Sequence, residues 1–170
     1  MKIEFLPFER RDLSLYLAWR NQPAVCWADS VAPYRPITAE GSANHLIKNR
    51  YAFKLRVDQV DVGYLGLIDY RPGDDQAEFF IVIGEVAQWG KGIGRAAMQQ
   101  LIAYAKTELG LKKLRGRVLG HNRRALALYQ RVGFRIVGHH PPCFRRDNQV
   151  YDIVRIELDL VNYSATLPES

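Results

Sequence analysis

The most constraining feature of this 170-residue sequence is the stretch 79–109, which predicts a buried strand, a glycine-punctuated loop and a long helix. Residues 77–83 form a short apolar run rich in Ile, Val and Phe, which is typical of a central strand covered on both faces. Apolar residues then recur at four-residue spacing from Ile93 to Ala105, which predicts an amphipathic helix of about four turns. Any fold of this chain must therefore place the loop at the end of a buried strand.

The glycine-punctuated loop has three features that favour an anion-binding site. Gly90, Gly92 and Gly94 lack side chains, so backbone N–H groups at the helix start can converge closely on a ligand. Lys91 and Arg95 lie at the helix N-terminus, where the macrodipole disfavours cations. Gly94 also stands in the first helical turn, where alanine would be more stable by up to about 1 kcal/mol. The simpler alternative is a tight turn with a solvated basic edge.

Two motifs carry a resemblance to a known family. The loop matches neither the P-loop nor the dinucleotide fingerprint, because no Gly-Lys-Ser/Thr closes it and no third glycine follows Gly92 by three residues. It resembles the signature Gln/Arg-x-x-Gly-x-Gly/Ala of the GNAT superfamily of acyl-CoA-dependent N-acetyltransferases, and it is closest to the branch that includes ribosomal-protein N-terminal, polyamine and amino-sugar acetyltransferases. Trp89 departs from that signature, since it stands where Gln or Arg is expected. Residues 122–134 are similar to the family block Asn-x-x-Ala-x-x-x-Tyr-x-x-x-Gly-Phe.

The resemblance extends over about residues 2–160 and implies an α+β fold. Its expected form is a mixed, mostly antiparallel central sheet flanked by helices, with splayed central strands. We expect residues 1–162 to form a single acetyltransferase domain and residues 163–170 to form a frayed tail. Residues 21–36 are expected to be a loop or a broken helix. Sequence patterns predict strands at 2–6, 51–57, 60–70, 77–83, 113–119, 134–138 and 150–158, and helices at about 13–21, 38–47, 93–109 and 122–132.

The resemblance also implies acetyl-CoA as cosubstrate, with its pyrophosphate on the glycine loop and its pantetheine arm along the central strand. On structural grounds alone, Asn122 is a good helix N-cap, and Tyr129 lies two turns later on the same helix face. The resemblance adds a contact from Asn122 to the pantetheine arm or its surroundings. The predicted cofactor-binding residues are Ile81, Val82, Ile83, Trp89, Gly90, Lys91, Gly92, Ile93, Gly94, Arg95, Asn122 and Tyr129.

Two catalytic roles follow from the expected chemistry. In the family, a tyrosine at the position of Tyr129 can protonate the departing thiolate, and a phenol with a pKa near 10 keeps its proton at neutral pH. The alternative is that Tyr129 packs in the core with its hydroxyl paired. The attacking amine must lose a proton, for which Glu78 is the first candidate because related enzymes often carry a glutamate there. Glu85, Asp69 and water are the rivals.

The acceptor must be inferred from the loops 21–49 and 139–149, which flank the expected cleft. Trp27 and Tyr34 are its candidate wall residues. These loops carry more basic than acidic residues, which disfavours a polyamine and favours a neutral or anionic acceptor. We expect direct acetyl transfer to a primary amine of a small molecule, such as an amino-sugar nucleotide or an amino acid derivative. Protein N-terminal acetylation, polyamine acetylation and a non-catalytic acyl-CoA sensor are the alternatives.

Composition narrows the remaining classes. The formal net charge of +6 favours a polyanionic partner, which coenzyme A satisfies without nucleic acid, and no long basic tract marks a nucleic-acid binder. Cys26 and Cys143 have no spacing that indicates a disulfide framework or a metal site. Two cysteines without a signal peptide favour a cytoplasmic setting, and no apolar run reaches membrane-spanning length. The oligomeric state is left open, although members of the resembled family often form dimers.

Overall fold

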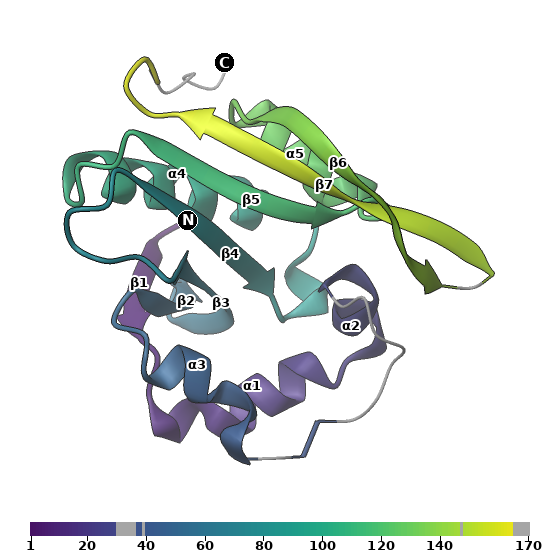
Figure 1. Ribbon diagram of the computed structural model, residues 1–170. Coiled ribbons are helices and arrows are strands. Elements are labelled where there is room, and N and C mark those ends of the chain that lie inside the picture. Colours follow the sequence, from purple (N-terminus) through teal and green to yellow (C-terminus); the bar gives the residue numbers. More distant parts are fainter. Residues whose placement is uncertain (30–36, 39, 147, 165–170) are drawn as a thin grey trace.

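The computed structural model describes residues 1–29, 37–38, 40–146 and 148–164. Its centre is a seven-stranded sheet with the strand order β1-β2-β3-β4-β5-β7-β6 (Figure 1). Only β4 and β5 pair in parallel, and the other neighbours are antiparallel. The predicted α+β fold with a mostly antiparallel sheet is thereby confirmed. The strands are β1 (Ile3–Pro7), β2 (Ala52–Val57), β3 (Val60–Ile68), β4 (Gln76–Ile83), β5 (Lys113–Leu119), β6 (Arg135–Arg146) and β7 (Gln149–Asp159).

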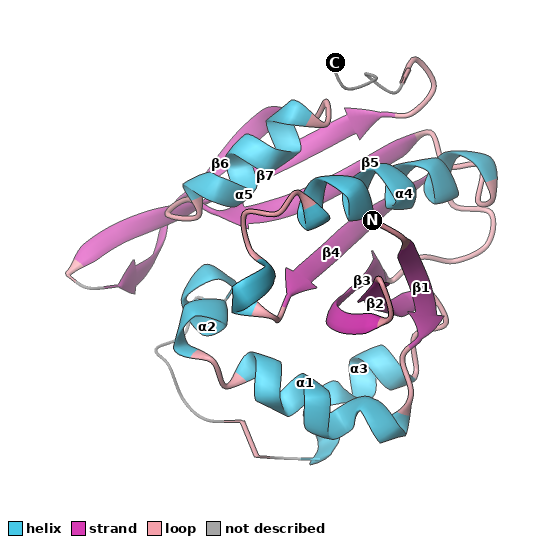
Figure 2. Cartoon of the chain, turned by 180° about the vertical axis from the view of Figure 1, so that it is seen from behind, coloured by secondary structure: helices cyan, strands magenta, loops and turns pink. Residues whose placement is uncertain are grey.

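Helices cover both faces of the sheet (Figures 1 and 2). The helices α4 (Ile93–Thr107) and α5 (Arg123–Arg131) lie on one face, where they bury a large apolar cluster against β2 to β5 and β7. The helices α1 (Leu13–Arg20), α2 (Pro23–Asp29) and α3 (Asn44–Ile47) enclose a second cluster against β2, β3 and β4. The N-terminal half of the sheet is therefore sandwiched between two helical layers.

Strand β4 shows how the sequence produces this sandwich. Successive side chains of a strand point to opposite faces. Phe79 packs in the α4 cluster, whereas Val82 packs in the α1 cluster, so the predicted central strand is indeed buried on both faces. Trp19 is fully buried and rests on Gly84, where an added Cβ would stand 2.1 Å from the indole Cγ. Glycine at this position allows α1 to approach the end of β4.

The central strands separate after a short paired segment, as predicted. In β4 and β5 only three residue pairs are in register, from Gln76 opposite Lys113 to Glu78 opposite Arg115. Beyond Glu78 the two strands diverge, so the backbones of their last residues do not pair with each other. This divergence opens the sheet at the C-terminal ends of β4 and β5.

Three segments differ from the sequence-based expectation. Pro23 begins a regular helix, α2, because proline is tolerated at the first helical position, where its missing N–H has no partner to lose. The predicted helix at 38–47 is a 3-10 turn followed by the single turn of α3. Strand β6 continues to Arg146 through Pro141, at a point where the pairing register with β7 shifts. Because β6 is an edge strand, a proline there removes no ladder bond that the sheet needs.

The C-terminal contacts extend slightly beyond residue 162. Tyr163 packs against the main cluster, and its carbonyl accepts a hydrogen bond of 2.8 Å from Lys106 Nζ. The predicted division into a domain 1–162 and a tail 163–170 stays a prediction. Tyr34 and the side chain of Cys143 lie outside the described part of the chain. None of the helices among the described residues is both long and apolar enough to cross a membrane.

Candidate active site

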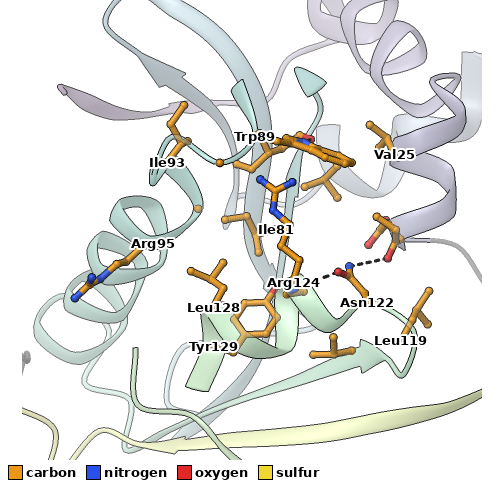
Figure 3. Close-up of a pocket in the computed structure, with 18 of the residues that line it drawn as sticks. Val25, Ile81, Trp89, Ile93, Arg95, Leu119, Asn122, Arg124, Leu128 and Tyr129 are labelled. Atoms are coloured by element: carbon orange, nitrogen blue, oxygen red, sulfur yellow. Dashed lines mark hydrogen bonds between the residues drawn. The ribbon is translucent and has the colours of Figure 1, made fainter. Parts of the chain in front are cut away.

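A cavity of about 570 Å³, the main recess, lies where β4 and β5 separate (Figure 3). Strand β4 supplies one side, strand β5 another, and the starts of α4 and α5 close the base. The end of α2 lies across the recess from α4. The parts of the chain predicted to bind the cofactor therefore meet in one cavity. Its lining includes Ile81, Val82, Ile83, Gln88, Trp89, Gly90, Gly92, Ile93, Gly94, Arg95, Arg117, Val118, Leu119, Asn122, Arg124, Ala125, Leu128, Tyr129 and Arg131, with Val25, Trp27, Ala28 and Asp29 from α2.

The glycine loop reaches the recess in a conformation that requires glycine. Gly90 and Gly92 have φ of 82° and 80°, in the left-handed region that other L-residues rarely adopt. Gly92 is the N-cap of α4, so the first N–H groups of this helix have no intrahelical acceptors. At Gly94 the constraint is a close approach, since an added Cβ would stand 3.1 Å from Leu128 of α5. A larger residue in this first helical turn would require the Leu128 side chain to shift.

The predicted cations of the loop occupy different places. Lys91 does not line the recess, and its Nζ donates to Gln88 Oε1 at 3.2 Å. Arg95 lies at the edge of the recess (Figure 3). The Arg124 guanidinium of α5 instead stands near the centre, 5.0 Å from the Trp89 ring centroid. Trp89 is itself held by its indole N–H, which donates to the Ile83 carbonyl at 2.8 Å.

The charges around the recess fit a phosphate-bearing ligand. Four arginines line it, whereas Asp29 is the only carboxylate among the described lining residues. Positive side chains and free N–H groups at a helix start both favour anions. Within the described residues, no three His, Cys, Asp or Glu side chains gather as a metal ion would require. The arginines are Arg95, Arg117, Arg124 and Arg131.

Asn122 is the N-cap of α5, as its position in the sequence predicts. Its Oδ1 accepts from the Ala125 backbone N–H at 3.1 Å. Its Nδ2 donates to the Ala28 carbonyl at 3.0 Å, which ties α5 to the end of α2. Asn122 also lines the main recess, so its predicted contact with the pantetheine arm stays a prediction.

Tyr129 lines the same recess from a buried position. Its side chain is 7% exposed, and its ring packs edge-on against Phe79 with centroids 5.2 Å apart. Phe134 contacts the ring from another side, at 5.9 Å. Burial raises the pKa of the Tyr129 phenol above its ordinary value, and the negative charge of Asp29 adds to the rise. The phenol therefore keeps its proton throughout the neutral range.

The three carboxylates predicted as candidate bases all lie outside the lining of the recess. Glu78 precedes the point where the strands diverge, and its Oε1 accepts from Arg117 Nε at 2.6 Å. Glu85 Oε1 accepts from the Trp19 indole at 2.7 Å. Asp69 follows β3 in a left-handed conformation with φ of 52°. Their proposed role as base stays a prediction.

Helix α2 supplies a wall that the sequence analysis anticipated only at Trp27. Trp27 is 45% exposed and lines the main recess, and its predicted role as a wall of the acceptor cleft stays a prediction. Asp29, at the end of the same helix, pairs with Arg20 at 2.5 Å. Burial by the surrounding walls raises the pKa of Asp29, and the Arg20 guanidinium offsets part of this rise. The Asp29 side chain is 46% exposed, and the residue lines the recess.

Trp27 also lines a second recess of about 600 Å³, between α2, the start of α5 and the strands β6 and β7. Its ring packs edge-on against His121 at 4.3 Å, and His121 Nε2 donates to the Trp27 carbonyl. His139 Nδ1 pairs with Asp152 Oδ2 on the facing strands. The loops 21–49 and 139–149, which the sequence analysis expected to flank the acceptor cleft, both contribute to this recess, whereas its parts from residues 120–123 and 150–152 were not anticipated because no motif links them. Its lining is completed by Gly120, Arg123, His140, Pro141, Gln149, Val150 and Tyr151.

Comparison with known proteins agrees with this geometry. An uncharacterised protein of Methanocaldococcus jannaschii is 29% identical over 136 residues, covering 73% of this chain and 26% of that protein. A candidate phosphinothricin acetyltransferase of Bacillus subtilis is 34% identical over 77 residues, covering 45% of this chain and 46% of that protein. The chain thus spans less than half the length of these curated relatives.

A solved structure and a family model complete the comparison. The crystal structure of spermidine N-acetyltransferase from Vibrio cholerae, in complex with CoA and spermine, has a TM-score of 0.79. It is 24% identical, covers 94% of this chain and 98% of its own, and shows the shared fold. The model of the acetyltransferase (GNAT) domain matches residues 2–135. Since that match takes in most of the sequence, the chain belongs to the GNAT acetyltransferase family.

Proposed function

We propose that this chain is an acetyl-CoA-dependent N-acetyltransferase that moves an acetyl group directly to a primary amine of a small molecule. The observation that carries the proposal is the main recess, where diverging strands, a helix start with left-handed glycines and a buried tyrosine meet. A strand edge left open by the divergence offers backbone groups to an amide-bearing chain such as pantetheine. The CoA bound to the Vibrio cholerae relative supports the choice of cosubstrate.

Different residues of the recess bind the cosubstrate and transfer protons. The N–H groups that follow Gly92 and the Arg124 guanidinium hold the diphosphate, since both favour negative charge. Acetyl-CoA supplies the thioester whose carbonyl carbon accepts the amine. Tyr129 donates its proton to the sulfur as the thiolate leaves, because the buried phenol is protonated at neutral pH. Glu78, the first candidate base from the sequence, is bound to Arg117 and lies outside the lining of the recess.

Direct transfer needs no acyl-enzyme. Cys26 is 7% exposed and packs within α2, so its thiol is not presented as a nucleophile. The amine can therefore attack the thioester itself once it is neutral.

The second recess favours a neutral or anionic acceptor over a polyamine. Its described charged side chains are Arg123, which lines it, and Asp152, whose carboxylate pairs with His139. A polyamine needs several unpaired carboxylates, whereas this recess offers aromatic walls such as Trp27. An amino-sugar nucleotide or an amino acid derivative has the ring or the acidic group that suits this lining. The spermine bound to the Vibrio cholerae relative favours a polyamine as the second candidate.

The test is thiol release from acetyl-CoA by the purified chain across an amine panel. The panel contains a nucleotide-linked amino sugar, amino acids, spermidine and a short peptide with a free N-terminus. We expect release with a neutral or anionic small amine and little with spermidine or the peptide. Preference for spermidine or the peptide would contradict the proposed acceptor class but not the proposed reaction. Binding of acetyl-CoA without release by any amine would show a sensor instead of an enzyme.

A further inference from the structure

Asp29 lines the main recess from α2, a helix that is far from the glycine loop in the sequence. It is the last residue of α2 and the only carboxylate among the described residues that line the cavity. Four arginines share that lining, and Asp29 also pairs with Arg20 of α1 at 2.5 Å. Binding of an anionic cosubstrate does not account for a carboxylate in this lining.

Among the described residues, the Asp29 carboxylate is hydrogen-bonded at one of its two oxygens. Oδ2 accepts from Arg20 Nη1 at 2.5 Å. Arg20 stands on α1 with its side chain 14% exposed, which limits the positions that the ion pair can adopt. Oδ1 has no hydrogen-bond partner among the described residues. An incoming ammonium group could therefore donate to Oδ1 without displacing the arginine.

Asp29 and Tyr129 line the same cavity. The negative charge of Asp29 contributes to the raised pKa of Tyr129, so the two groups lie within electrostatic reach. The pKa of Asp29 is raised by burial, and the Arg20 guanidinium offsets part of the rise; a higher carboxylate pKa favours proton uptake. The other titratable groups near Asp29 are Arg20 and Tyr16 of α1, Tyr64 of β3, Arg117 of β5 and Arg124 of α5.

We propose that Asp29 is the catalytic base, which receives the acceptor ammonium at Oδ1 and takes its proton; this assignment rests on the proposed function. The neutral nitrogen forms a bond to the thioester carbonyl carbon, and the nitrogen then loses its second proton to solvent. The C–S bond breaks, and its electron pair leaves with sulfur, which takes the proton of Tyr129. Proton exchange with water returns the phenolate to phenol and Asp29 to carboxylate. The products are the amide and the free thiol.

The position of Glu78 makes it the weaker candidate. Glu78 lies on the paired part of β4, before the strands diverge, and it does not line the recess. Its carboxylate is bound to Arg117, which lines the recess. Glu78 can therefore act on the site through Arg117 but has no direct path to the amine.

The experiment compares Asp29→Asn with Glu78→Gln, using the best amine from the panel. For Asp29→Asn we expect kcat/KM for the amine to fall about 10²- to 10³-fold at neutral pH, as for loss of a general base. Acetyl-CoA affinity, measured by calorimetry, should change by less than about twofold. The defect should shrink as pH rises, because free amine becomes abundant without a base. It should also be small for hydroxylamine, which is already neutral at neutral pH.

Controls separate this role from a structural one. Asp61→Asn removes a carboxylate that pairs with Arg56 at 2.6 Å outside the recess, so it should leave the pH profile unchanged. Asp29→Glu keeps the base and should retain more activity than Asp29→Asn. Equal kinetics and pH profiles for Asp29→Asn and the wild type would overturn the assignment, as would a large defect confined to Glu78→Gln. A wild-type chain that binds acetyl-CoA but acetylates no amine would instead overturn the proposed function, and this assignment with it.

Discussion

The two walls of the main recess differ in how far apart along the chain their parts lie. The glycine-loop wall, residues 81–95, is one continuous strand, loop and helix start. The α2 wall, formed by Val25, Trp27, Ala28 and Asp29, is tied to the start of α5 by two hydrogen bonds that each span 94 residues. The first wall is a local motif, whereas the second exists only through tertiary contacts.

This difference separates two tasks. The glycine-loop wall offers backbone donors, which recognise the phosphates that every acyl-CoA shares. The α2 wall offers side chains, namely an aromatic ring and a carboxylate, which can vary with the acceptor. Substitutions in the first wall should therefore change acetyl-CoA affinity, and substitutions in the second should change the handling of the amine.

The largest effect is expected at Tyr129, which lies between the walls. Tyr129→Phe removes the proton donor for the thiolate but keeps the ring that packs on Phe79. We expect kcat to fall about 10²-fold or more, with acetyl-CoA affinity nearly unchanged. Steady-state kinetics and calorimetry would measure both. Tyr104→Phe, on α4 outside the recess, is the matched control and should keep full activity; an unchanged kcat in Tyr129→Phe would remove its role as acid.

The next largest effect tests the glycine-loop wall alone. Gly92→Ala places a side chain on a left-handed residue, which costs about 1 to 2 kcal/mol unless the loop moves. Movement of the loop misdirects its N–H groups, so we expect the acetyl-CoA Kd to rise about tenfold. Gly73→Ala is matched, because Gly73 also has positive φ and open space but lies outside the recess. Equal acetyl-CoA affinities in the two variants would contradict a role for the loop conformation.

A smaller effect is expected on the α2 wall. Trp27→Ala removes a ring that lines both recesses but keeps the backbone carbonyl that binds His121. We expect the KM for the amine to rise about fivefold, equivalent to about 1 kcal/mol of lost contact, with acetyl-CoA affinity unchanged. Kinetics with each substrate varied in turn would show this. A rise confined to the KM for acetyl-CoA would contradict the separate roles that we assign to the two walls.

The smallest effect concerns Trp89, the departure from the family signature. Trp89→Phe removes the indole hydrogen bond to the Ile83 carbonyl but keeps an aromatic face for Arg124. We expect a loss of about 1 kcal/mol in the free energy of unfolding, measured by denaturant titration. The acetyl-CoA Kd should rise less than about threefold, because backbone donors remain. A tenfold rise would mean that the side chain at this position takes part in holding the cosubstrate.

The glycine-loop wall could be predicted from the sequence because its signals are contiguous. The apolar run of β4, the glycine spacing and the four-residue repeat of α4 each carry a local physical rule; α4 begins at Ile93 as predicted and ends at Thr107, two residues before the predicted end. The splayed strands were anticipated from the family resemblance. The N-cap at Asn122 followed from side-chain chemistry alone.

The α2 wall could not be predicted in the same way. Asp29 is one acidic residue in an irregular, proline-containing segment, and only the folded contacts with Arg20 and with α5 bring it to the recess. Lys91 shows the converse, since its place in the motif did not reveal that its side chain binds Gln88 and does not line the cavity. Sequence patterns predict which backbone segments come together better than they predict the positions of charged groups on those segments.

The central claim is that the diphosphate of acetyl-CoA rests on the start of α4 while the thioester lies between the diverging strands. A crystal structure of the chain with acetyl-CoA tests it most directly. The account predicts phosphate oxygens against the N–H groups of residues 90–95 and the sulfur within hydrogen-bonding reach of the Tyr129 hydroxyl. Acetyl-CoA bound elsewhere, or with its sulfur far from Tyr129, would contradict it.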